Sequence, residues 1–343
     1  MASAADMRSL ALFVALTAPL SRGIAFRSPA PGCTDSAFAT HFDFHDTPWL
    51  NLHNFLFKEA KLRRGIADDG LGARGNLTED TAGARPLDPQ EHAGWNDAVE
   101  YYASVIIRDD MGLDSVVARI NDRLANAAPD EQLVDADLPS PLRRVLLQAM
   151  PVYRVVWWPV HERRNEQWIG RMRAQLAHTE PCLAPRLAQL LEGSWPSEPI
   201  RVDATVYASW FGAYSTLHPL HSTISTTARG SQDTHGLEVL LHEAGHGMLG
   251  TIDSTLTAQA RRQRRALPPE LSHLVLFYTA GAIMTELVPE YTPYAEAFGI
   301  WDQNATARRY QAILQREWQP YIDGHRSLSE AIAGIVHRLP SSS

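Results

Sequence analysis

The sequence predicts a mainly α-helical protein with a small β-sheet, an α+β fold. Most segments repeat apolar residues at helical spacing, as in 95–107, 113–127 and 268–288. Two short segments, 201–209 and 221–227, are instead alternating or β-branched, which is typical of strands. Because both precede a helical segment at about 235–249, we expect a small sheet beside that helix.

Further helices are expected on both sides of these strands. A helix is expected from about Pro48, followed by a Gly- and Asp-rich surface loop at 65–91. The segment 141–177 is interpreted as two helices broken near Pro151 and Pro159, since proline inside a helix removes a hydrogen bond. The last expected helices are 304–317 and 327–338.

Composition and charge are those of a soluble globular protein. The chain has 343 residues, 45% of them hydrophobic and 20% charged, enough for one large domain or two closely packed halves. Its formal net charge is −8 and it has no basic runs. Nucleic acid is therefore not an expected partner.

The N-terminus has the features of an export signal. Arg8 precedes the apolar run LALFVALTAPL at 10–20, and GIA at 23–25 offers small residues for cleavage. Residues 1–25 are therefore predicted to be a signal peptide, and the protein to be periplasmic or extracellular. No later segment is apolar enough to span a membrane, so no integral membrane segment is expected after the signal is removed.

The chain has two cysteines, Cys33 and Cys182. In an oxidising compartment they can pair and tie the N-terminus of the mature chain to its middle; the alternative is two unpaired thiols. Neither belongs to a CxxC pair, so a zinc site built from cysteines is not expected.

The segment LEVLLHEAGHGMLG, residues 237–250, carries an HExxH motif. Residues four apart share a helix face, so His242 and His246 can present two imidazoles to one Zn²⁺ ion. Glu243 is then placed to take a proton from a water molecule that the metal activates. Gly245 costs about 1 kcal/mol in a helix interior, which a close approach of substrate or of a neighbouring element would explain.

The third metal ligand is open between two residues. His273 lies near the start of the next long helix and Glu286 near its end. Thirteen helical residues span roughly 20 Å, so both cannot reach one ion. We favour His273, with Glu286 as the alternative.

HEAGH with these flanks resembles the zincin metallopeptidases. It also occurs in ATP-dependent proteases of the FtsH type, but this chain has no GxxxxGK[ST] loop. The stretches FDFHDTPWLNLHNFLF, ASWFGAYSTLHPLHSTIST and HLVLFYTAG are similar to a group of exported bacterial zincin-like proteins. That group often carries a glutamate after FYTAG, where this chain has Ala282. The change matters if that glutamate binds the metal and is harmless if His273 does.

Two residues are candidates to stabilise an oxyanion during hydrolysis. His221 is expected on an edge strand beside the histidine helix, where zincins bind extended substrates. Tyr278 follows His273 by five residues. Tyr291 and Tyr294, in the loop after that helix, are weaker candidates.

Together these features predict an exported zinc metallohydrolase, most simply a peptidase acting on a peptide or protein. A helical N-terminal subdomain, 34–200, would pack against a zincin-like catalytic subdomain, 201–343, with the substrate in the cleft between them. Two alternatives stay open. One is a zinc-binding protein without turnover, and the other is a helical structural or interaction protein with a chance HExxH.

Overall fold

The computed structural model describes residues 41–66, 85–108, 115–129, 132–133, 138–209, 212–217 and 219–339. The predicted signal peptide, 1–25, and Cys33 lie outside these ranges. Cys182 is disulfide-bonded. Among the helices described, none is both long and apolar enough to cross a membrane.

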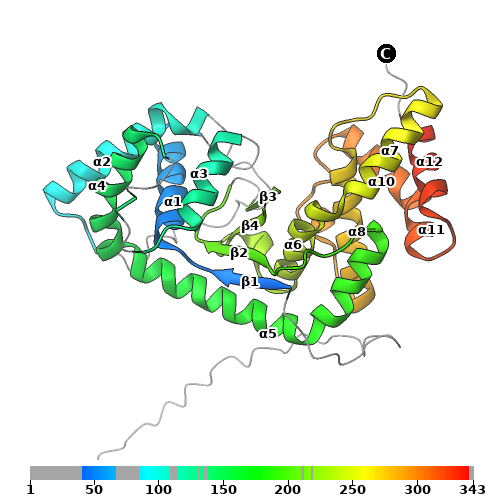
Figure 1. The fold of residues 1–343 in the computed structure, drawn as a ribbon, viewed down its shortest axis with the longest axis horizontal. Coiled ribbons are helices and arrows are strands. Elements are labelled where there is room, and N and C mark those ends of the chain that lie inside the picture. Colours follow the sequence, from blue (N-terminus) through cyan, green and yellow to red (C-terminus); the bar gives the residue numbers. More distant parts are fainter. Residues whose placement is uncertain are drawn as a thin grey trace, which may run out of the picture.

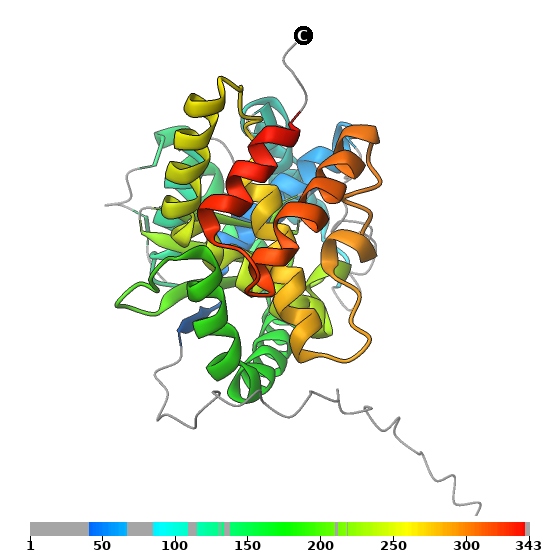
Figure 2. The same cartoon turned by 90° about the vertical axis from the view of Figure 1, so that its right-hand side faces the viewer.

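The fold is mainly α-helical with one small sheet, which confirms the predicted class (Figure 1). On one side of the sheet lie α1 (Pro48–Arg63), α2 (Pro89–Ser104), α3 (Ser115–Ala125) and α4 (Ser140–Val156). On the other lie α6 (Asp233–Gly245), α7 (Gly250–Gln263), α8 (Leu271–Leu287), α9 (Tyr294–Ala297), α10 (Ala305–Glu317), α11 (Gln319–Ile322) and α12 (Leu328–Arg338). The red α12 packs between α7 and α10 in Figure 2.

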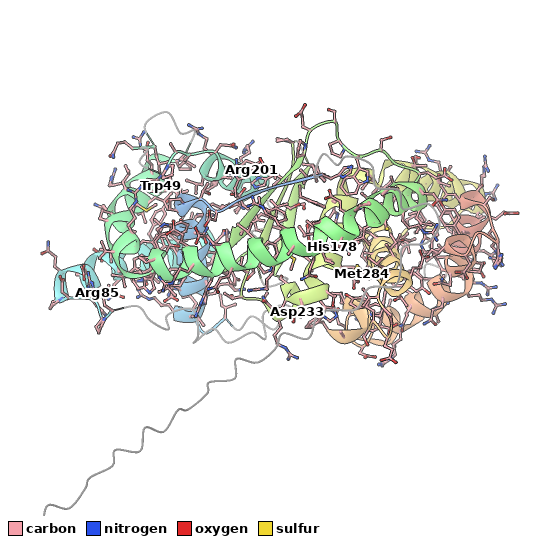
Figure 3. The ribbon with its side chains drawn as sticks, turned by 90° about the horizontal axis from the view of Figure 1, so that it is seen from below. Trp49, Arg85, His178, Arg201, Asp233 and Met284 are labelled. Carbon is pink, nitrogen blue, oxygen red and sulfur yellow. The ribbon has the colours of Figure 1, made fainter. Side chains whose placement is uncertain are left out.

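The long helix α5 (Trp158–Leu191) connects the two sides. It runs beneath the sheet from α4 to the C-terminal helices, as Figure 3 shows from below with His178 on it. Pro159 lies in its first turn, as predicted, where a missing N–H costs no helical bond. The predicted break at Pro151 is wrong, because α4 continues through it. Pro151 is exposed, so water can solvate the carbonyl group that loses its partner.

The sheet has four strands in the order β1-β2-β4-β3. Their bounds are β1 (Phe42–His45), β2 (Ile200–Thr205), β3 (Ala213–Leu217) and β4 (Leu220–Ser225). β1, β2 and β4 are parallel, and β3 pairs antiparallel with β4. β2 and β4 confirm the two predicted strands, while β1 and β3 were not predicted. The edge strand that contacts α6 is β3, so the prediction that His221 occupies the edge is wrong.

Two hydrophobic cores lie on either side of the sheet. One is formed by α1–α4 together with Val206, Tyr207 and Tyr214. The other combines the inner face of α5, for example Trp168, with β1, β2, β4 and the helices from α6 onward. Because α5 contributes to the second core, residues on both sides of position 200 build it. The division into subdomains at that position stays a prediction.

A buried amide network joins α1, α5 and the sheet. Asn51 of α1 donates to the carbonyl oxygen of Ala204, and its own side-chain oxygen accepts from the Val206 amide and from Asn165 of α5. Asn165 in turn accepts from Thr226. These side chains satisfy backbone groups just past the end of β2, which fixes where the strand leaves the sheet.

Helices α6 and α8 approach each other closely at Gly245. A Cβ atom built on Gly245 would lie 2.3 Å from Cδ1 of Leu276, which is itself fully buried. Gly245, expected inside the helix, is the last residue of α6, and a neighbouring element packs on it, one of the two explanations expected from the sequence. This approach brings the start of α8 beside the end of α6.

We expect Gly245→Ala to lower the free energy of unfolding of the metal-free protein by about 1–3 kcal/mol, because the new methyl group overpacks against Leu276. Urea unfolding measures it. Gly250→Ala is the control, since a Cβ there meets nothing within 4 Å. In a Leu276→Ala background the penalty should disappear; a penalty that persists there would show that the helix contact is not its cause.

Candidate metal centre

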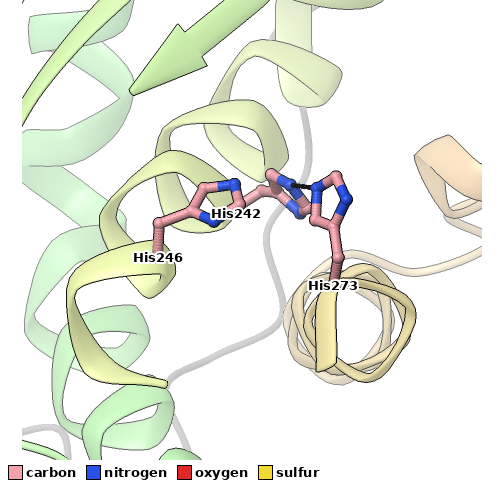
Figure 4. A group of neighbouring side chains, drawn as sticks. All are labelled: His242, His246 and His273. Carbon is pink, nitrogen blue, oxygen red and sulfur yellow. Dashed lines mark hydrogen bonds between the residues drawn. The ribbon is translucent and has the colours of Figure 1, made fainter. Parts of the chain in front are cut away.

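Three histidines converge where α6 ends and α8 begins (Figure 4). His242 lies in the last turn of α6. The α-helix ends at Gly245, but His246 keeps helical dihedral angles (φ −55°, ψ −37°), so the four-residue spacing still directs both imidazoles to one side. His273 is in the first turn of α8, which crosses opposite them.

The three imidazoles form a nearly equilateral group. Their ring centroids are 4.9 Å, 4.8 Å and 5.0 Å apart for the pairs 242–246, 242–273 and 246–273. One nitrogen from each ring lies within 4.8 Å of the others, and the Nε2 atoms of His242 and His273 are 2.8 Å apart. Ligands of a tetrahedral zinc ion at about 2.0–2.1 Å stand roughly 3.4 Å apart. The group therefore fits one ion after small side-chain adjustments.

Burial keeps these histidines neutral, which is the form that binds metal. Desolvation, followed by repulsion from the other histidines, lowers the pKa of His242 well below its usual range. The same causes lower the pKa of His246 to about 3, and desolvation lowers that of His273 to about 4. All three rings are thus ready to donate a nitrogen lone pair at neutral pH.

Glu243 lies beside the histidines and is held by the edge strand. The hydroxyl of Ser215 on β3 donates to Oε2 of Glu243 at 2.7 Å. Burial raises the pKa of Glu243 to about 7, although the Ser215 bond opposes this. A carboxyl group with such a pKa exchanges protons readily near neutral pH, as a general base requires. Ser215 was missed in the sequence because its strand was not predicted.

A cavity of about 870 Å³ opens onto this group. It is bounded by β3, α6, α8 and the segment from Ile300 into α10. Phe277 forms part of its wall and packs on the ring of His242 at 3.9 Å between centroids. The sequence signal was available: Phe277 lies four residues after His273 and so shares its helix face.

Of the two candidate third ligands, the structure brings His273 to the histidine pair and leaves Glu286 away from it. Glu286 lies at the other end of α8, where its carboxylate accepts from Arg186 of α5 at 2.8 and 3.1 Å. The helix length that separated the two candidates in the sequence keeps Glu286 out of the histidine group.

Neither predicted oxyanion donor lines the cavity. His221 is buried, with Nδ1 at 2.8 Å from Asp122 of α3 and Nε2 at 2.7 Å from Asp203 of β2. The hydroxyl of Tyr278 donates to Gln319 on α11. Tyr278 is five residues from His273 and so points away from the metal-facing side of α8.

Tyr294, a weaker candidate in the sequence, does line the cavity. Its ring stacks on Phe277 with centroids 6.2 Å apart. Burial, followed by the charges of Glu238 and Glu243, raises the pKa of its hydroxyl. The hydroxyl is therefore protonated at neutral pH, and it lies against Gly230, where an added Cβ would be 2.8 Å from it.

Glu238, one turn before His242, anchors the segment that carries Tyr294. Its Oε2 accepts from the Tyr291 hydroxyl at 2.6 Å and from the Tyr294 amide at 2.8 Å. Its Oε1 is buried without a partner, and burial raises the pKa of this carboxyl to about 7. Glu238 could not be selected from sequence patterns, because its partners lie 53 and 56 residues later in the chain.

Comparison with known proteins adds no relative: no family model, no curated protein and no solved structure matches the chain.

The pKa of Glu238 predicts a pH effect on stability. Because the folded-state pKa of about 7 is above the ordinary 4.5, folding favours the protonated form. This stabilisation is complete below pH 4.5 and is lost as the pH rises through 7, at a cost on the order of 3 kcal/mol. Gln in place of Glu238 does not titrate, so Glu238→Gln should gain stability relative to wild type between pH 4.5 and 8.

Urea unfolding of the metal-free proteins at pH 5 and pH 8 measures this difference. Glu198→Gln, at an exposed position, is the control and should show no such change. If the difference in the free energy of unfolding between Glu238→Gln and wild type were equal at both pH values, the raised pKa of Glu238 would be contradicted.

Proposed function

We propose that the chain is an exported zinc-dependent metallohydrolase, a peptidase, with its centre at the three histidines. The observation that carries the proposal is the convergence of His242, His246 and His273 beside Glu243 at the bottom of an open cavity. The N-terminal export features support action outside the cytoplasm.

The donor set suits zinc. Three neutral imidazole nitrogens are the ligands of many catalytic zinc sites, which leave a further position open. Nδ1 of His242 is buried without a hydrogen-bond partner, which is unfavourable for stability. A metal-binding role of the other ring nitrogen, Nε2, would explain why a polar ring is buried here. A zinc ion bound there would polarise a substrate carbonyl group and make a water molecule more acidic.

Glu243 would act as general base and then as proton donor. Its raised pKa allows it to take a proton from the attacking water and to deliver it to the leaving amine. Ser215 holds Oε2 in place through its hydroxyl, so the carboxylate is oriented before the substrate binds. His221 and Tyr278 lie outside the cavity lining, so neither is assigned to oxyanion stabilisation.

The edge strand supports a peptide as substrate. Among the described strands β3 pairs with β4 alone, and Ala213, Ser215 and Leu217 line the cavity. An extended peptide can add to the unpaired side of such a strand through main-chain hydrogen bonds. Its carbonyl groups would then run past Glu243 and the histidines.

Metal analysis tests the site. We expect about one zinc per chain in the purified mature protein, retained in Glu243→Ala and lost in His246→Ala and His273→Ala. Glu286→Ala is the matched control and should retain zinc, because Arg186 rather than metal binds that carboxylate. An absence of zinc even after reconstitution would leave a helical protein with a chance motif.

Cleavage of a peptide library tests turnover. Glu243→Ala should lower cleavage by about 100- to 10 000-fold, the usual contribution of a general base, while zinc stays bound. If the wild type binds zinc but cleaves no peptide, the zinc-binding protein without turnover is the correct reading.

A further inference from the structure

One wall of the cavity beside the histidines carries five apolar side chains, next to Gln303, Asn304 and Thr306, which also line the cavity. Leu274 and Phe277 of α8 face it from one side, and Ala307 and Tyr310 of α10 from the other, with Ile300 between the helices. On α10 the two residues are three apart and so share a face. Because Phe277 also packs on the ring of His242, this wall continues to the metal-facing histidines.

The charges in the cavity have one sign. In the described part of the chain, its charged lining residues are Glu238, Glu243 and Glu270, and no lysine or arginine joins them. Glu238 is buried and Glu243 belongs to the proposed chemistry. Glu270, the exposed residue that precedes α8, contributes a carboxylate at the rim of the apolar wall. A substrate carboxylate placed here would find repulsion and no basic partner.

We infer that this wall is a side-chain subsite that selects an apolar residue next to the scissile bond and rejects substrate carboxylates. We define the subsite as Leu274, Phe277, Ile300, Ala307 and Tyr310, with Glu270 at its rim. Its occupant is an apolar side chain of a peptide whose nearby groups are neutral or cationic. The enzyme therefore cleaves within chains or near amino termini, and does not remove C-terminal residues. This inference rests on the proposed function.

Two residues set the selection. Ala307 is the smallest side chain of the subsite, so its methyl group determines how much room an incoming side chain has. A cavity of about 870 Å³ is in the range that holds drug-sized ligands, so a peptide segment with one aromatic side chain fits. Glu270 sets the charge preference, because its carboxylate at the rim of the subsite is exposed and can meet an incoming substrate.

The test uses the full mature protein, loaded with zinc, and a mixture of acetyl-Ala-Ala-X-Ala-Ala-amide peptides with Phe, Leu, Ala, Lys or Asp at X. Mass spectrometry of the competing substrates gives ratios of kcat/KM. Acetyl-Ala-Ala-Phe with a free carboxylate is added to represent a C-terminal residue. Calorimetric binding of the same peptides to Glu243→Gln gives a second readout that needs no turnover.

The wild type should have a higher kcat/KM for the Phe and Leu peptides than for the Ala peptide. All three values should exceed those for the Asp peptide and for the free-carboxylate peptide. Ala307→Phe should lower the ratio of Phe to Ala by about 10- to 100-fold, the range that one or a few methylene groups carry in an apolar pocket. Ala312→Phe, on the exposed side of the same helix, is the control and should leave the ratio unchanged.

Glu270→Arg should raise kcat/KM for the Asp peptide and for the free-carboxylate peptide, each relative to the Phe peptide, by about tenfold, because the rim then attracts an anion. Glu198→Arg makes the same change in net charge at an exposed position outside the cavity and should have no effect. The subsite is overturned if kcat/KM is the same for all peptides. It is also overturned if Ala307→Phe and Glu270→Arg leave the kcat/KM ratios unchanged.

The two proposals fail in different ways. If zinc-dependent cleavage occurs but kcat/KM and binding affinity are the same for all peptides, the subsite is overturned and the peptidase proposal stands. No cleavage by wild type, with calorimetric selectivity that responds to Ala307→Phe and Glu270→Arg, supports the subsite and overturns hydrolysis. No cleavage and no selective binding overturns both.

Discussion

The candidate centre depends on the close packing of α6 against α8. His242 and His246 come from one helix, and their spacing needs only local helical geometry. His273 reaches them because Leu276, three residues later on α8, fills the space that a side chain at position 245 would occupy. The glycine inside HEAGH thus leaves room for the side chain through which α8 packs on α6.

Local patterns were enough to predict most of the helices, two strands and the histidine pair, because each rests on short-range periodicity. α7 and the part of α5 after residue 177 were not predicted. The third histidine was favoured from helix length alone, which separates His273 from Glu286. Long-range pairing was beyond such reasoning. β3 has no clear alternation, so neither the strand nor Ser215 was foreseen, and the strand of His221 was wrongly expected at the edge of the sheet. Tyr278 was chosen by proximity in sequence, whereas the helix face that carries His273 also carries Phe277.

Burial gives the centre its chemistry. The same desolvation that lowers the pKa values of the three histidines raises that of Glu243 to about 7. Neutral ligands and a readily protonated base therefore arise from one cause, the packing of apolar residues around the end of α6. Perturbed titrating groups gathered at an open cavity are typical of functional sites, and here they coincide with metal-ligating geometry.

Zinc K-edge X-ray absorption of the reconstituted protein distinguishes a three-histidine centre from other zinc sites, because it reports the ligands and not only the metal. We expect three imidazole nitrogens at about 2.0–2.1 Å together with a light oxygen ligand. One imidazole should be missing in His273→Ala. A spectrum with fewer than three imidazoles in the wild type, or one that His273→Ala leaves unchanged, would contradict the three-histidine centre.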